Sequence, residues 1–561
     1  MKQCIQCKSS FEVLPEDRQM LDQLSPDFGG QKYLVPDPTH CPDCRAGRRS
    51  AVVNEFHLYP SQCALCQGKT LSQYPPHSNM TVYCRECWHS DKWDSLSYGR
   101  DFDFSRSFFE QFHELKKNVP AQALSQQGTM INSEYTHLIG SCKNCYLIMH
   151  ADFCENCYYS YGFKHNKYCV DGFYNLHSEL CYDCVDVHKC YGLIASQDCV
   201  NSSDSAFLRD CVGVKDSFLC TGLRQKQYCF QNKQLTKEQY EQKMVGIDLG
   251  SHEQYQRFYQ MLQEMQKGRV CKEYQGTNIQ NSIGDHLNNC KDCYRCYDCE
   301  DVEAGRYVYQ VVLGSKNVMD IYQYGTNLQA SYECSISGEN SYGILFGIEC
   351  HMSSSNLLYC WYMESCHDCF GCVYMHHKRY CIFNKQYTKE EYERMVERIV
   401  EHMVETGEWG EFFPISVSPF GYNKTTAFMY YPLEKEEVLA RGWKWDEYEN
   451  PVVAKKTIPA NRLPDNIKDI PDDILNWAIV CEITGQPFKI TPQELSFYRD
   501  RSLPIPHLHP YQRHLNRFKR RNPRHLYPRQ CAKCHAETQT TYSPDRPEVV
   551  YCEHCYLKNI Y

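Results

Sequence analysis

The chain has 561 residues and a net charge of −9, with 37 cysteines and 44 tyrosines. An acidic total argues against indiscriminate nucleic-acid binding by the whole chain but is compatible with one basic domain. No apolar run is long enough to cross a bilayer, and the start, Met-Lys-Gln-Cys4, has no hydrophobic signal core. We therefore expect a cytoplasmic protein of several domains, whose cysteines bind metal rather than form disulfides.

The N-terminal module, residues 1–100, contains four C-x-x-C pairs. Paired thiolates on short turns are what a closed tetrahedral zinc site needs. We expect two zinc ions here, one on Cys4, Cys7, Cys41 and Cys44 and the other on Cys63, Cys66, Cys84 and Cys87.

The C-terminal module, residues 476–561, repeats the words of the N-terminal one, because His525-Leu-Tyr-Pro matches His57-Leu-Tyr-Pro. It predicts a third site on Cys531, Cys534, Cys552 and Cys555, and so about three Zn²⁺ ions per chain. The remaining ligand positions hold Cys481, Thr484, His509 and Gln512.

Ligand positions that change together in the C-terminal copy are expected to have served one metal. We therefore assign their N-terminal counterparts, Cys4, Cys7, Cys41 and Cys44, to one zinc ion. Cys481 and His509 either keep a weak site or form a metal-free turn, and the turn is favoured because four ligands are the norm.

The segment between the modules begins with a predicted connecting helix in residues 101–122. Ser107-x-x-Glu110 can form a capping box there, and Pro120 ends the helical run. From about residue 140 the cysteines recur at multiples of three, with small or apolar residues in phase between them. A period of three fits neither a helix nor a plain strand, but it fits a β-solenoid that turns one residue in three inward.

We expect two solenoid blocks, 123–235 and 271–387, with a slip of phase inside the second. The inward cysteines form either a ladder of small apolar thiols, which we favour, or further metal sites. The strongest exception to the ladder is the opening of the second block, with Cys290, Cys293, Cys296 and Cys299.

The blocks end alike, at Tyr228-Cys-Phe-Gln-Asn-Lys and Tyr380-Cys-Ile-Phe-Asn-Lys, and each ending leads into a predicted helix. The helical insertion 236–270 and the amphipathic helix 388–408 are expected to cap the solenoid ends. Residues 409–475 form a connector rich in proline and aromatic residues, which we expect to lie along the surface of a domain.

A run of cations without any acid lies at residues 513–529. Interleaved histidine and aromatic residues make it a candidate surface for phosphates and unpaired bases, and the equal alternative is a face docked on the acidic remainder of the chain. The candidate nucleic-acid residues are Arg513, Arg517, Lys519, Arg520, Arg521, Arg524 and Arg529.

The stretch from Cys481-Glu-Ile-Thr-Gly-Gln-Pro-Phe to Leu503-Pro-Ile-Pro resembles the zinc-ribbon, treble-clef-like modules of uncharacterised bacterial proteins, many of them from candidate phyla. The resemblance implies zinc and a bacterial cytoplasm and brings no established activity. The P-loop, G-x-G-x-x-G and H-E-x-x-H signatures are missing.

The predicted fold is mainly β and multi-domain, with such zinc modules flanking a Cys-rich, two-block β-solenoid with capping helices. The function that we infer from sequence is a non-enzymatic zinc scaffold or adaptor whose basic C-terminal module binds structured RNA or the ribosome. The alternative is a protein-interaction scaffold that uses the solenoid surface, and the third is an enzyme of unrecognised type in the solenoid groove.

Overall fold

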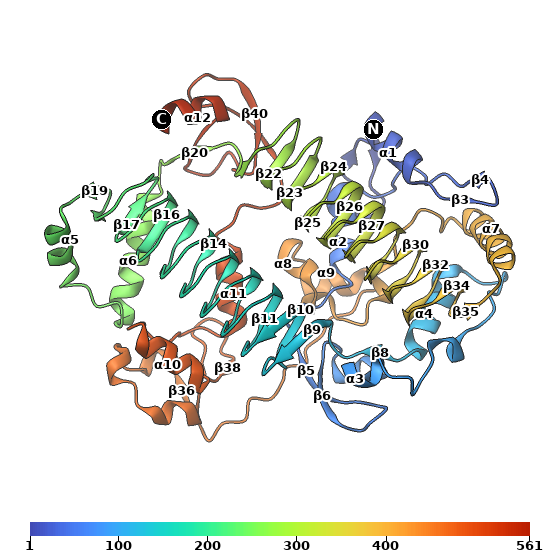
Figure 1. Ribbon diagram of the computed structural model, residues 1–561, viewed down its shortest axis with the longest axis horizontal. Helices are drawn as coiled ribbons and strands as arrows, with labels where there is room; N and C mark the ends of the chain where they lie inside the picture. Colours follow the sequence, from blue (N-terminus) through green and yellow to red (C-terminus); the bar gives the residue numbers. More distant parts are fainter. Residues whose placement is uncertain (561) are drawn as a thin grey trace.

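The computed structural model describes residues 1–560 and is built around two stacks of short parallel strands (Figure 1). The first stack is an 11-stranded sheet that runs from β9 (Gln126–Ile131) to β19 (Lys233–Gln234), and the second is a 15-stranded sheet from β21 (Gly276–Thr277) to β35 (Lys385–Gln386). We call them block 1 and block 2. The predicted mainly-β protein with a two-block solenoid is confirmed.

Block 1 is a regular stack of 12-residue coils. Phe173 of β13 (Phe173–Leu176) lies opposite Tyr161 of β12 (Tyr161–Lys164), and Val185 of β14 (Val185–His188) lies opposite Phe173. Every third residue along these coils has a positive φ, as at Tyr168 (51°) and Asp171 (56°). Left-handed residues turn the chain sharply, so a corner falls after every short side and the predicted period of three results.

The cysteines of both blocks point inward, as predicted. Cys169, Cys199 and Cys211 are fully buried, and each thiol donates to a backbone carbonyl two residues earlier, at 3.3 to 3.4 Å. Buried thiols stacked coil over coil act as small apolar side chains with a weak donor. Whether any of them also binds metal stays a prediction.

Block 2 contains the predicted slip of phase, and its cause is a set of longer coils. Lys316 of β26 (Lys316–Gly325) lies opposite Gln329 of β27 (Gln329–Gly338), which lies opposite Tyr342, so these coils have 13 residues. The extra residue sits at a corner where two consecutive residues have positive φ, such as Glu339 and Asn340. Each longer coil shifts the inward phase by one residue.

The two blocks lie side by side and run in opposite directions. Near the start of block 1, Gln127 contacts His351 of block 2 at 3.3 Å. Further along block 1, Asp186 shares Arg521 with Asp298, which lies early in block 2. As the residue number in block 1 increases, the residue number of its neighbour in block 2 therefore decreases.

Helices follow each block where the sequence predicts them. α5 (Lys237–Met244) and α7 (Lys389–Glu405) both begin with the predicted capping box, and α6 (His252–Met265) packs Phe258 against Phe207 and Phe218 of the last coils of block 1. α4 (Phe108–Asn118) occupies the predicted helix at 101–122. Among residues 1–560, we find no helix that combines the length and the apolar character needed to cross a membrane.

Candidate metal centres and arginine helices

The same tight turn occurs four times at the two ends of the chain. In the first copy the amide of Cys4 donates to Ser9 and the amide of Lys8 donates back to Cys4, and the turn at Cys63 repeats both bonds. The residue four places after the first cysteine has a positive φ in every copy, at Lys8, Gln67, Gly485 and His535. Such a turn points both side chains of a C-x-x-C pair to one side.

Three groups of four cysteines come together at these turns, with all sulfur atoms of a group within 4.8 Å of one another. This is the ligand spacing of a four-thiolate metal site. The groups are those predicted from sequence: Cys4, Cys7, Cys41 and Cys44; Cys63, Cys66, Cys84 and Cys87; and Cys531, Cys534, Cys552 and Cys555.

Each of these groups contains at least one thiol whose pKa is lowered and at least one whose pKa is raised, as burial chiefly raises that of Cys84. Cys41 is the N-cap of α2 (Pro42–Ser50), and Cys84 is the N-cap of α3 (Arg85–Trp88). Burial alone would raise the pKa of Cys63, but amide hydrogen bonds from Cys66 and Cys84 outweigh burial and lower it to about 6. Cys531 behaves in the same way, with its pKa lowered to about 6. Metal ligands must be deprotonated, and the thiols of Cys63 and Cys531 meet this condition most readily in their groups.

The fourth turn keeps the backbone shape of a knuckle but uses its side chains differently. His509 is the N-cap of α11 (Pro510–Phe518), where its Nδ1 accepts the amide of Tyr511 at 3.2 Å. Burial would raise the pKa of Cys481, but backbone hydrogen bonds, led by that of His509, lower it. Residues at the ligand positions of this copy, such as His509, therefore form hydrogen bonds within the loop, where the other copies have thiols that face one another.

Helix α2 docks on block 2 through buried arginines. Arg45 Nε lies 2.8 Å from Asp320, and Arg49 reaches Asp320 at 3.0 Å and Glu333 at 2.8 Å. Arg49 and Asp320 are both 0% exposed. Arg45 also lies over the ring of Tyr307, 5.1 Å from its centroid. Buried charges of this kind must be paired, since removal of one partner leaves an uncompensated charge.

Helix α11 docks on block 1 in the equivalent way. Aligned on the ligand positions, its Arg513 and Arg517 correspond to Arg45 and Arg49, and both pair with Asp171, at 2.8 Å for Arg517. Arg513 lies over the ring of Tyr159 at 4.6 Å. Counted back from the shared endings, Asp171 stands on the coil of block 1 that corresponds to the coil of Asp320. The duplication therefore includes the docking contact as well as the metal turns.

Beyond α11, the arginine run continues across the seam between the blocks. Arg520 pairs with Asp183 at 2.6 Å, Arg521 with Asp186 at 2.9 Å and with Asp298, and Arg524 with Asp298 at 2.9 Å. Burial would raise the pKa of the Asp298 carboxyl, but the two guanidinium groups lower it. The run thus joins block 1 to block 2.

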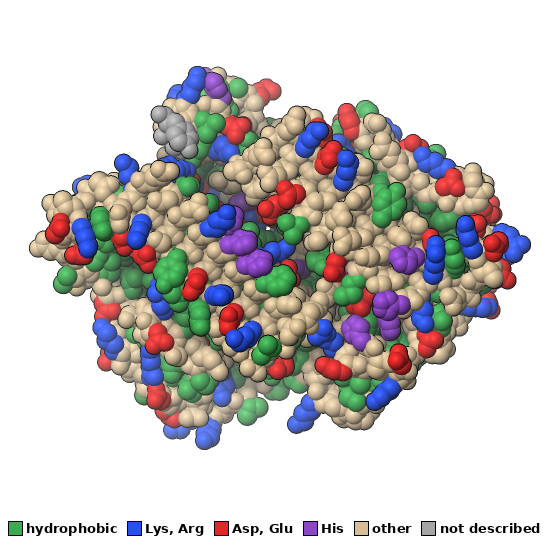
Figure 2. All heavy atoms as spheres, viewed as in Figure 1, with side chains coloured by type: hydrophobic (Ala, Val, Ile, Leu, Met, Phe, Trp, Pro, Cys, Tyr) green, Lys and Arg blue, Asp and Glu red, His purple; other side chains and the backbone are tan. Residues whose placement is uncertain are grey.

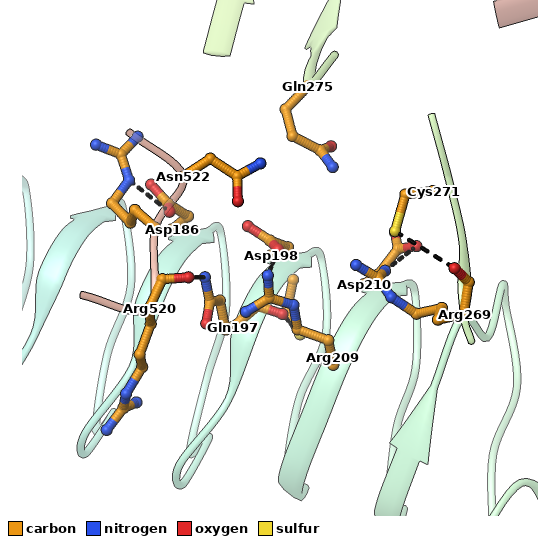
Figure 3. A network of polar contacts seen from close by, with 12 residues as sticks. Asp186, Gln197, Asp198, Arg209, Asp210, Arg269, Cys271, Gln275, Arg520 and Asn522 are labelled. Atoms are coloured by element: carbon orange, nitrogen blue, oxygen red, sulfur yellow. Dashed lines mark hydrogen bonds and ion pairs between the residues drawn. The ribbon is translucent and has the colours of Figure 1, made fainter. Parts of the chain in front are cut away.

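The acidic partners form ladders at solenoid corners. Asp186, Asp198 and Asp210 follow one another at the coil spacing, each with a positive φ (Figure 3). Arg209 pairs with Asp198 at 3.0 Å, and Arg269 pairs with Asp210 at 2.8 Å. Aspartate tolerates the left-handed corner that the coil requires, so one residue type provides both the turn and the charge.

Five arginines of the predicted nucleic-acid surface at residues 513–529 pair with carboxylates of the solenoid, so their guanidinium groups are engaged within the chain, and nucleic-acid binding by this run stays a prediction. These are Arg513, Arg517, Arg520, Arg521 and Arg524. The local charge count could not reveal their partners, which lie hundreds of residues away. Lys519 is exposed, and Arg529 donates to the carbonyl of Ser543 at 3.2 Å. The open alternative, docking on the acidic solenoid, is what the structure shows.

Sequence reasoning missed the acidic ladders, although a signal was present. Asp186, Asp198 and Asp210 repeat every 12 residues, and so do Asp171 and Asp183. Once the coil length is known, these two repeats mark charged stripes along two successive corners of block 1.

No family model matches the chain, and no curated protein matches it. A listed solved structure, a "putative acetyltransferase" from Desulfovibrio desulfuricans G20, covers 50% of this chain and 79% of that chain at 11% identity, with a TM-score of 0.10. A TM-score this low supports no inference about fold or activity.

Proposed function

We propose that the protein is a non-enzymatic, bacterial cytoplasmic scaffold that holds three Zn²⁺ ions and binds a partner protein along the exposed side of its solenoid. The metal is assigned as zinc because four thiolates with no open position suit a structural zinc site. The site residues are the twelve cysteines of the three groups, which tie the terminal modules into their folds.

The observation that carries the partner proposal is a stacked ladder on the outer side of block 1. Phe153 stacks on His165 at 5.0 Å between ring centroids, and His165 stacks on His177 at 4.9 Å. Phe153 is 60% exposed, and Tyr168 and Tyr191 are 46% exposed. Exposed aromatic side chains on a rigid repeat are typical of protein-binding surfaces.

The surface of the molecule is hollowed on one face. Figure 2 shows histidine and basic side chains gathered beside a hollow near the middle of this face, with acidic side chains on its opposite rim. A small pocket lined by Asp298, Tyr430, Arg521 and Arg524 has a volume of only about 20 Å³, room for about one water molecule. The open surface is therefore the better place for a partner than the interior.

The test is affinity purification of the full chain from native bacterial lysate with nuclease present. A variant with Phe153→Ala, His165→Ala and His177→Ala should lose the co-purified protein, and Lys519→Glu with Arg529→Glu should keep it. If both variants recover the same proteins, the ladder is not the contact. Recovery of RNA without nuclease, lost with Lys519→Glu and Arg529→Glu, would favour the RNA-binding alternative.

A further inference from the structure

The two docking helices differ in what fixes their starting points. α2 has nine residues, its N-cap is Cys41, and Cys44 lies in its first turn, so two of the four ligands of the first metal group hold its beginning. The docking residues Arg45 and Arg49 follow directly. Isolated helices shorter than about 12–15 residues are marginal in water, so α2 depends on what anchors it.

Additional contacts fasten the metal loop to the rest of the molecule. Arg48 Nη1 lies 2.9 Å from Glu411, and Thr39 Oγ1 donates to the same carboxylate at 2.5 Å. The Trp409 indole donates to the carbonyl of Leu34 at 2.9 Å. The first metal group therefore lies at the junction of the N-terminal module, block 2 and the segment after α7.

α11 also has nine residues but starts without a metal group. Its beginning is fixed by the His509 cap, and Arg513 makes a further contact with Glu494 at 3.5 Å. Arg520, Arg521 and Arg524 then continue the docking beyond the end of the helix. Docking of α11 is thus secured by ion pairs and by aromatic packing, such as that of His514 on Phe173, without a metal group at the start of the helix.

From this difference we propose that the metal on Cys4, Cys7, Cys41 and Cys44 controls one docking contact, that of α2 on block 2, and that loss of the metal releases it. Removal of the metal frees the start of α2, so Arg45 and Arg49 leave Asp320 and Glu333. These carboxylates are 0% and 1% exposed, and buried acids without partners draw in water, so the 13-residue coils around them open as well. The C-terminal module stays docked, which makes the opening metal-dependent and confined to one half of the molecule.

The experiment is hydrogen–deuterium exchange on the full chain, read by mass spectrometry, with zinc content measured on each sample. The test variant is Cys7→Ser, and the matched control is Cys534→Ser, because both replace the exposed member of a four-cysteine group. The peptides to follow cover α2, β26 and β27 on one side and α11, β13 and β14 on the other.

We expect Cys7→Ser to lose one zinc ion and to exchange roughly tenfold faster in α2, β26 and β27, with α11 and block 1 unchanged. Cys534→Ser should lose one zinc ion and leave α2 protected. Readdition of zinc to chelator-treated wild-type protein should restore protection of α2.

Three outcomes would overturn the proposal: zinc is lost and α2 stays protected, α11 opens to the same extent as α2, or the whole chain exchanges at once. The first two leave the zinc scaffold itself standing. Absence of zinc from the wild-type protein would instead remove the scaffold proposal and this one together, and the zinc measurement distinguishes these cases.

Discussion

Helices α2 and α11 occupy equivalent places in the two modules, but only α2 follows a complete set of thiol ligands. Both present two arginines one turn apart to a single buried aspartate, Asp320 for α2 and Asp171 for α11. The copy without the ligands keeps the docking contact and extends it with further arginines. Docking and metal binding are therefore separable properties of this module, and the following experiments test how far they separate.

Loss of a metal group should have the largest effect, because binding free energies of structural zinc reach about 10–16 kcal/mol and are also folding free energy. We expect about three zinc ions in protein purified without added metal, and about two in Cys63→Ser or Cys552→Ser, each with its module unfolded. Cys481→Ser should keep all three. Elemental analysis with circular dichroism checks this, and fewer than two ions in the wild-type chain would contradict the module assignment.

The second-largest effect should come from removal of the aspartate that two buried arginines share. Asp171→Ala leaves Arg517 buried without a carboxylate and Arg513 with Glu494 alone, so we expect a loss of about 3–5 kcal/mol in the free energy of unfolding, and a similar loss for Asp320→Ala. Asp37→Ala is the control, because its pair with Arg18 is exposed. Guanidinium denaturation measures all three. If Asp171→Ala costs no more than the control, the buried pairs do not fasten the modules.

Acid should weaken the docking of α11. His514 of α11 is buried, and burial together with Arg517 lowers its pKa well below the ordinary value, whereas α2 has Ala46 at the equivalent position. The folded state keeps the ring neutral while the unfolded state protonates it below about pH 6.5, so this contribution to stability is complete above that pH and is lost as the pH falls. By pH 5 the loss is at most about 2 kcal/mol.

The variant His514→Phe keeps an aromatic ring between Phe56 and Phe173 and cannot be protonated. It should flatten the acid side of the stability profile, measured as unfolding midpoints between pH 7 and pH 5. An unchanged acid slope in this variant would mean that another group is responsible.

A change inside the solenoid should be milder and should not distinguish the modules. Cys199→Ala removes one buried thiol from block 1, and we expect a cost of about 1–2 kcal/mol with the zinc content unchanged. A thermal melt with elemental analysis is sufficient. A fall in metal content would show that the inward cysteines are ligands.

The smallest effect should belong to the cation that the docking contact leaves free. Lys519 is exposed, so Lys519→Glu should change the free energy of unfolding by no more than about 0.5 kcal/mol, whereas Arg517→Glu should place a charge of the wrong sign beside Asp171 and destabilise strongly. The two substitutions make the same charge change, so similar denaturation midpoints would contradict the buried position of Arg517.

Much of the architecture could be predicted because it is written locally. The period of three, the repeated words at both ends and the capping boxes at Thr236 and Thr388 each depend on residues close in sequence. The partners of the arginine run could not be predicted in this way. Arg513 and Asp171 meet only because two blocks of fixed coil length bring them together. A count of local charges therefore predicted a solvent-exposed arginine where the structure has an internal ion pair.

The sulfur-lined interior of the solenoid has a consequence for whether unfolding of this protein can be reversed. Its thiols are shielded only as long as the coils stay stacked, since the described cysteines of both blocks are buried. A chain that opens in air presents many thiols at once, and exchange or oxidation among them competes with restacking. Unfolding then becomes irreversible, and the lifetime of the folded protein is set by the rate at which the coils open. A reducing agent should lengthen the time after heating during which the protein can still refold.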